Sequence, residues 1–116
     1  DAYSQVIFAP TQLVIEQPQV LHRFLEATFL GWHWAIHHPS EAAQLLVEQY
    51  VEPDYQDIAY QTQSLEIIAN YVEPSDQPIG LLNQDRWQRS ARQLAQAGLI
   101  QTVPALDKSI DLSLWS

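Results

Sequence analysis

The sequence predicts a mostly helical protein with four helices and a short strand near each end. Three observations carry this prediction. Apolar residues recur at steps of three and four along four segments, which is the period of an amphipathic helix. Prolines and one glycine end these segments, and residues 3–8 and 110–114 follow the β-branched or alternating pattern of strands. With 116 residues, 47% hydrophobic and 16% charged, the chain is expected to form a single globular segment, residues 1–116.

The first and clearest helix is predicted over residues 18–38. Its main apolar stripe, expected in the core, comprises Leu21, Phe24, Leu25, Thr28, Phe29, Trp32, Ala35 and Ile36. A second stripe of Arg23, Ala27, Leu30 and Trp34 indicates that both faces contact protein. Gly31 interrupts the helix at a cost of about 1 kcal/mol relative to alanine, so we expect another backbone to approach it closely. Pro39 then ends the helix.

Polar capping residues predict where the other helices begin. Ser40 is expected to cap a second helix that stops at Pro53, and Asp54 a third helix over residues 54–72, ended by Pro74. Asn83 is expected to cap a fourth helix, and Gly98 to end it in the left-handed conformation that such C-terminal caps require.

The two predicted strands lie at the ends of the chain. Residues 3–8 are expected to form a strand that Pro10 stops, and residues 11–15 either extend it or form a separate turn. Alternation of apolar and polar residues over 110–114 predicts a second short strand or an extended packing segment.

Composition excludes several classes of function. Five basic and 14 acidic residues give a formal net charge of −9, which argues against nucleic-acid and anionic-membrane binding because phosphates repel such a surface. No apolar run approaches the ~20 residues of a membrane span. The absence of cysteine excludes disulfides, thiolate zinc sites and a cysteine nucleophile. Because the chain begins with Asp1 rather than methionine, we expect it to be processed or cut from a larger protein.

Four side chains are candidates for a binding site. His33 and His37 lie four residues apart, so both rings share one helix face, as zinc ligation requires. The position after His33 holds Trp34 instead of the glutamate of zinc proteases, so the favoured interpretation is a polar helix edge without metal. Trp34 and Arg86 are the candidate ligand-binding residues, as a stacking wall and an anion partner. No catalytic residue and no cofactor are expected.

One stretch of the sequence resembles a known family. Residues 17–28 are followed by Gly31-Trp32, Ala35, His38-Pro39 and Glu41-Ala42. This order is similar to periplasmic substrate-binding proteins of the thiamine-pyrimidine, taurine and alkanesulfonate type. Four later segments extend the resemblance over most of the chain. They are Ile79-Gly80, Asp85-Arg86-Trp87-Gln88, Gly98-Leu99-Ile100 and Ser109-Ile110-Asp111-Leu112.

The resemblance implies the C-terminal portion of a bilobed α/β ligand-binding domain whose N-terminal lobe lies outside this sequence. It implies a small organic ligand, no enzymatic activity and a periplasmic or extracytoplasmic location. The downstream partner would be an ABC importer, or a histidine kinase or diguanylate cyclase that uses the domain as a sensor. Without the rest of the domain, we expect copies to dimerise or to exchange elements. The alternatives are a free-standing acidic helical module that binds a protein and, less favoured, a metal-dependent enzyme that uses His33 and His37.

Overall fold

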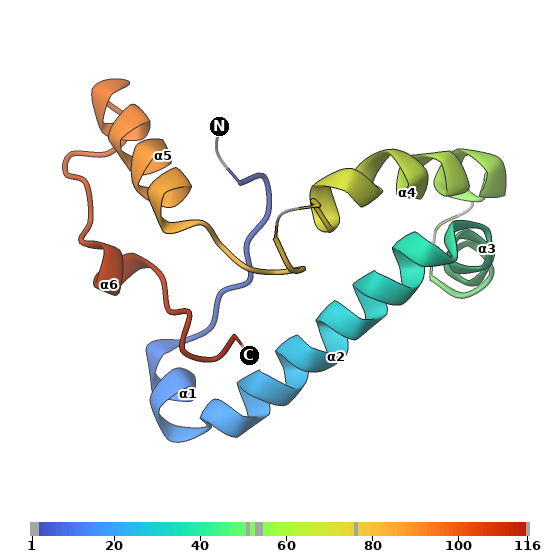
Figure 1. Ribbon diagram of the computed structural model, residues 1–116, viewed down its shortest axis with the longest axis horizontal. Coiled ribbons are helices and arrows are strands. Elements are labelled where there is room, and N and C mark those ends of the chain that lie inside the picture. Colours follow the sequence, from blue (N-terminus) through green and yellow to red (C-terminus); the bar gives the residue numbers. More distant parts are fainter. Residues whose placement is uncertain (1–2, 51, 53–54, 76, 116) are drawn as a thin grey trace. The chain divides into compact units, whose positions relative to one another are not determined.

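A computed structural model describes residues 3–50, 52, 55–75 and 77–115, and within these ranges it contains six helices and no strand (Figure 1). The four predicted helices correspond to α2 (Pro18–His37), α3 (Pro39–Gln49), α4 (Ile58–Val72) and α5 (Gln84–Gln96). The other two, α1 (Thr11–Glu16) and α6 (Leu106–Ser109), are short. The chain divides into a terminal unit (Asp1–Arg23 and Leu81–Ser116) and a central unit (Phe24–Gly80).

In the central unit, α3 packs against α4. The predicted cap of α3 is wrong by two positions. His38 is the N-cap residue, Pro39 opens the helix, and no side chain caps it, because proline brings the fixed φ and the missing N–H that suit a first helical position. Helix α4 begins after Asp57, whose side chain accepts a 2.9 Å hydrogen bond from the Tyr60 N–H. The expected boundaries at Pro53 and Asp54 lie outside the described residues.

Two glycines of the central unit differ in their surroundings. Gly31, expected to face a second backbone, has no atom within 4 Å of the position of an added Cβ, so that prediction is wrong. The close approach occurs instead at Gly80, which has φ 82° and lies against the ring of Phe29.

In the terminal unit, both predicted caps of α5 are confirmed. The Asn83 side chain accepts from the Arg86 N–H at 2.9 Å. At the other end Gly98 has φ 72°, its N–H donates to the Ala95 carbonyl, and the Leu99 N–H donates to the Leu94 carbonyl. These two bonds form a Schellman motif, which satisfies carbonyls that the helix end would otherwise leave unpaired.

Tyr3 and Trp87 join separate segments of the terminal unit. The Tyr3 hydroxyl accepts from the Asn83 N–H at 2.8 Å, and the rings of Tyr3 and Trp87 are 6.5 Å apart. The Trp87 indole N–H donates to the Ser109 hydroxyl of α6 at 3.0 Å. The N-terminal segment and α6 are therefore both attached to α5.

Neither predicted terminal strand forms in the part of the chain that the structure describes. Residues 11–16 fold as α1 instead, and α6 precedes the alternating tail. A strand is stable only when its backbone groups pair with a neighbouring strand, and the described residues offer no such partner. Alternation alone therefore does not make a strand of residues 110–114, and the chain turns at 113–114, where the Trp115 N–H donates to the Leu112 carbonyl oxygen at 3.1 Å.

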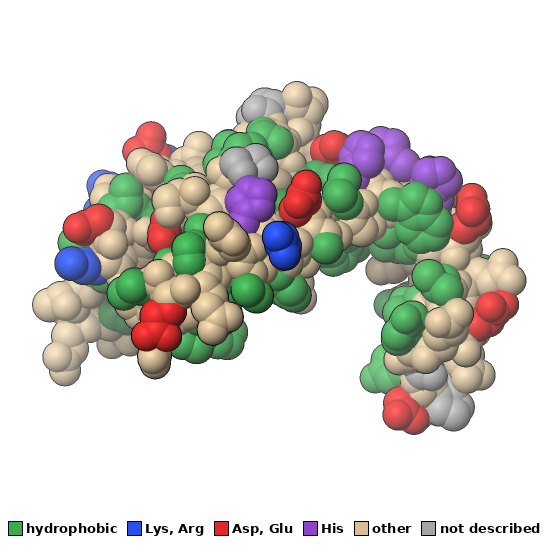
Figure 2. Space-filling view, turned by 90° about the horizontal axis from the view of Figure 1, so that it is seen from below, with side chains coloured by type: hydrophobic (Ala, Val, Ile, Leu, Met, Phe, Trp, Pro, Cys, Tyr) green, Lys and Arg blue, Asp and Glu red, His purple; other side chains and the backbone are tan. Residues whose placement is uncertain are grey.

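Little of the apolar surface is buried. Among the described hydrophobic residues, the two alanines Ala43 and Ala91 are buried. Large side chains stay exposed instead: Phe24 is 56% exposed, Leu30 63% and Trp32 37%, which contradicts the core positions predicted for Phe24 and Trp32. Figure 2 shows hydrophobic side chains reaching the surface among polar ones. The helices of this chain are therefore determined more by their local sequence pattern and capping residues than by packing in a hydrophobic core.

Candidate functional site

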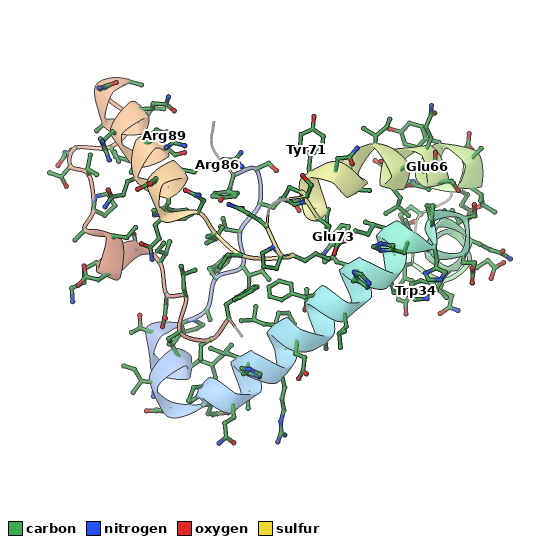
Figure 3. All side chains as sticks on the ribbon, in the orientation of Figure 1. Trp34, Glu66, Tyr71, Glu73, Arg86 and Arg89 are labelled. Atoms are coloured by element: carbon green, nitrogen blue, oxygen red, sulfur yellow. The ribbon has the colours of Figure 1, made fainter. Side chains whose placement is uncertain are left out.

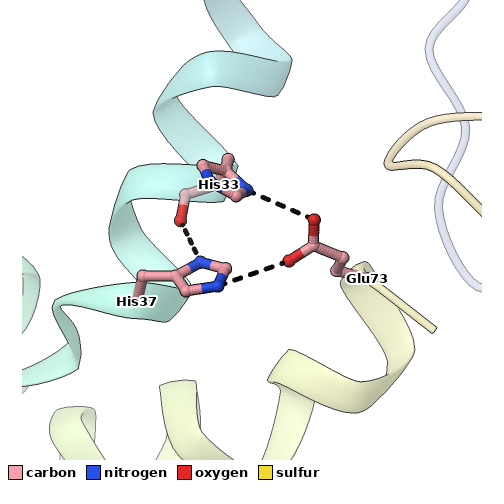
Figure 4. A group of neighbouring side chains, drawn as sticks. All are labelled: His33, His37 and Glu73. Carbon is pink, nitrogen blue, oxygen red and sulfur yellow. Dashed lines mark hydrogen bonds and ion pairs between the residues drawn. The ribbon is translucent and has the colours of Figure 1, made fainter. Parts of the chain in front are cut away.

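Two turns of α2 and the end of α4 bring three metal-ligating side chains together (Figure 4). His33 and His37 occupy one face at the C-terminal end of α2, because residues four apart are neighbours on a helix. Glu73 is the C-cap residue of α4 and comes 40 residues after His33. Figure 3 shows Glu73 at the end of α4, with its side chain directed toward α2. All three lie within the central unit.

The distances show that one carboxylate contacts both imidazoles. The Nδ1 atom of His33 is 3.2 Å from Oε1 of Glu73, and the Nε2 atom of His37 is 3.7 Å from Oε2. One ligand atom from each of the three residues can be chosen so that all lie within 4.8 Å of one another. The side chains of His33, His37 and Glu73 are 55%, 51% and 35% exposed, so solvent and small ions reach them.

The orientation of the His37 ring is fixed by its own helix. Its Nδ1 lies 2.8 Å from the backbone carbonyl oxygen of His33. A carbonyl oxygen can only accept, so Nδ1 carries the proton and donates it. In the neutral ring the lone pair is then on Nε2, the nitrogen that faces Glu73. Nε2 is therefore the nitrogen of His37 that is available on the side of Glu73.

Helix dipoles of both signs meet at this group. Glu73 follows the last turn of α4 and the histidines lie at the last turns of α2, whereas the positive end of α3, which begins at Pro39, follows His37 almost directly. The central unit carries nine acidic residues and no lysine or arginine, whereas the terminal unit carries five of each sign. The whole formal charge of −9 therefore belongs to the central unit. Its histidines are its only basic side chains.

Trp34, a predicted ligand-binding residue, is next to this group in sequence but not part of it. Its ring stacks on the imidazole of His38, with the ring centroids 5.3 Å apart and the planes at 15°. The Nδ1 atom of His38 is 2.9 Å from the Trp34 carbonyl oxygen, which holds the imidazole on its own helix. His38 is thus excluded from the cluster, although the sequence places it beside His37.

Arg86, the other predicted ligand-binding residue, belongs to the terminal unit. Its guanidinium carbon lies 4.3 Å from the centroid of the Tyr3 ring, a cation–π geometry. Arg86 therefore contacts the Tyr3 ring in the terminal unit, and Trp34 contacts the His38 imidazole in the central unit.

A surface depression adjoins the carboxylate. Its volume is about 480 Å³, and it is lined by Glu73, Pro74, Ser75, Gln77 and Pro78. Glu73 therefore borders both the histidine pair and this open space.

Glu73 is the member that sequence reasoning missed. In the sequence it stands directly before Pro74, the residue predicted to end the third helix, and no ligand role was predicted for it. A carboxylate at a helix C-terminus is unfavourable next to the dipole, which is a signal that another group compensates it. That signal does not identify the partner, because the contact with α2 is a tertiary one.

The family model described as NMT1/THI5 like matches residues 1–42. The matched stretch contains α1, α2 and the start of α3, and so includes His33 and His37. No curated protein and no solved structure matches the chain. The resemblance described for the later words of the sequence lies outside the matched residues. Among the described helices, none has both the length and the apolar character that a membrane crossing demands.

Proposed function

We propose that this chain is part of an extracytoplasmic small-molecule-binding domain of the periplasmic-binding-protein type. The match to the NMT1/THI5-like family over residues 1–42 supports the proposal. It coincides with the stretch in which the sequence most resembles binding proteins for thiamine-pyrimidine, taurine and alkanesulfonate. The role proposed is binding without catalysis.

The observation that carries the proposal is the exposed apolar surface of α2. Phe24 and Leu30 are each more than half exposed. Water-exposed apolar surface is costly at about 25 cal/mol per Å², so covering these side chains with another element would be favourable. In a bilobed α/β domain, such helices pack on a parallel sheet. The described part of this chain has no strand, so the sheet would come from the remainder of the domain.

The proposed ligand is a small organic molecule held between two lobes, delivered to an ABC importer or sensed on behalf of a signalling output. Trp34 and Arg86 stay the candidate contacts from this chain, as an aromatic wall and as a cation. Both side chains already contact rings, so a ligand would have to join or replace those contacts.

The alternative is a free-standing acidic module that binds a protein through α2. The same exposed side chains favour it, together with the charge of the central unit. The two proposals differ in what covers α2: another part of the same protein, or a separate partner.

The experiment compares this chain with the full-length protein that contains it. Quenching of tryptophan fluorescence by acrylamide, which is uncharged, reports exposure without the repulsion that iodide would meet. We expect strong quenching in the chain alone and much weaker quenching in the full-length protein. A panel of aminopyrimidines and alkanesulfonates should raise the melting temperature of the full-length protein for one ligand class. Equal quenching in both proteins, together with no thermal shift, would favour the protein-binding alternative.

A further inference from the structure

We propose that His33, His37 and Glu73 bind one divalent first-row transition-metal ion, for which Zn²⁺ is the fitting probe. Two imidazole nitrogens and one carboxylate oxygen form a recurrent ligand set for zinc, with water or another ligand in a fourth position. The proposal does not depend on the small-molecule function proposed above, because it rests only on contacts within the central unit.

Two of the observed spacings are close to those around a tetrahedral ion, whereas the three ligand atoms as a set lie within 4.8 Å of one another, so the group would contract around an ion. With metal–ligand bonds of 2.0–2.2 Å, neighbouring ligand atoms around zinc are ~3.3 Å apart. The two nitrogen–oxygen distances, 3.2 Å and 3.7 Å, bracket this value. The longer one exceeds the length of a hydrogen bond, and at 3.7 Å an ion would contact Nε2 of His37 and Oε2 of Glu73 from beside the line that joins them. Because both histidines are half exposed, small rotations of the side chains would complete the geometry.

The hydrogen bond of His37 prepares its ring for metal. Metal-bound histidines usually donate their second nitrogen to a carbonyl or carboxylate, which fixes the tautomer and raises the basicity of the ligating nitrogen. His37 already donates Nδ1–H to the His33 carbonyl oxygen at 2.8 Å and directs Nε2 toward Glu73. His38 makes the same type of backbone contact, to Trp34, but has no carboxylate opposite it in the group.

Charge favours a cation at this position. The Glu73 carboxylate and two helix C-termini contribute negative potential, which the start of α3 at Pro39 offsets in part, and the central unit has no lysine or arginine. A divalent ion would neutralise the carboxylate and both dipole ends while leaving the histidines uncharged. The hard ions Ca²⁺ and Mg²⁺ prefer six or more oxygen ligands or octahedral water, so we do not expect them to replace zinc here.

The test is calorimetric titration of ZnCl₂ into the tag-free chain after treatment with a chelator. The expected result is one ion per chain. The variants His33→Ala, His37→Ala and Glu73→Gln should each weaken binding about tenfold or more, as even outer-sphere changes cost 10–100-fold. Ring-proton shifts of His33 and His37 in NMR spectra should move with zinc, whereas those of His22 should not. Far-ultraviolet circular dichroism verifies that each variant keeps its helices.

His38→Ala is the matched control, because it removes the neighbouring histidine and leaves the three ligands. It should bind zinc as the unchanged chain does. Glu73→Gln is the decisive variant, since a pair of histidines four apart on a helix can hold zinc weakly by itself. Unchanged affinity in Glu73→Gln, equal losses in His38→Ala and His33→Ala, or no binding at millimolar zinc would each overturn the proposal.

Discussion

The ring of Phe29 in α2 fills the space beside the α-carbon of Gly80, where any other residue would place its β-carbon. Gly80 also has φ 82°, a left-handed conformation that only glycine adopts without strain. The contact fixes the end of the loop that follows α4 against α2. It is therefore a tertiary restraint within a unit that buries little apolar surface.

We expect Gly80→Ala to lower the free energy of unfolding by about 1–2 kcal/mol. Left-handed backbone strain supplies this loss, and the added methyl group would also displace the outer atoms of the Phe29 ring. Urea denaturation followed by circular dichroism measures the loss. Gly31→Ala is the control within the same unit: it has open space around the new methyl group and should stabilise α2 by about 1 kcal/mol. A loss of the same size for both substitutions would contradict the packing at Gly80.

Tyr3→Phe should release the backbone N–H of Asn83. The Tyr3 hydroxyl accepts this N–H at 2.8 Å, and a hydrogen bond of this kind contributes about 1 kcal/mol. The phenyl ring keeps its position under the Arg86 guanidinium, so the substitution isolates the hydroxyl. Hydrogen exchange measured by NMR should show faster exchange at Asn83. The exposed Tyr71→Phe change is the control and should leave exchange at Asn83 as it was.

Local signals predicted much of the fold. Asn83 and Gly98 were identified from sequence because a helix cap depends on the few residues around it, and both caps form as expected. The main helices are found for the same reason. The prediction of terminal strands was wrong because a strand needs a partner strand from elsewhere in the chain or beyond it. Alternating apolar and polar residues do not indicate whether such a partner exists.

The sequence predicted the two histidines of the candidate site but not its carboxylate. The spacing of His33 and His37 is a local property of α2, whereas Glu73 reaches them through a contact across 40 residues. At Gly31 the sequence suggested a tertiary contact that the structure does not contain among the residues it describes. Its cost to the helix suggested a tertiary contact, yet the close contact involves Gly80, whose φ could not be derived from its neighbours.

Asp111 provides a pH-dependent contact in the tail. Hydrogen bonds from the Ser113 side chain and from its backbone N–H, the latter at 2.8 Å, lower the pKa of Asp111 below its ordinary value. A depressed folded-state pKa stabilises the turn above the unfolded-state pKa, and this contribution is lost as the pH falls through the folded-state pKa. The carboxyl group is almost fully solvated, so the effect on global stability is small.

An NMR titration from neutral pH into the acidic range should therefore show the Ser113 amide shift following the Asp111 carboxyl group. Asp111→Asn keeps an acceptor oxygen but cannot titrate, so its Ser113 amide shift should be flat over the same range. A Ser113 amide that titrates equally in both proteins would show that the Asp111 contact is absent.

The exposed side chains of α2 predict self-association of the isolated chain. Phe24 and Leu30, on two different stripes of the helix, leave more than half of their surface in water, and contacts between copies would bury part of it. Multi-angle light scattering over a wide concentration range should therefore give a mass that rises above the 13.3 kDa of one chain. Phe24→Gln with Leu30→Gln keeps the charge and should shift association to higher concentration. Glu26→Gln, on an exposed position of the same helix, tests charge alone and should change association less. A constant 13.3 kDa species throughout would show that the net charge of −9 keeps copies apart, so that exposed apolar area does not drive them together.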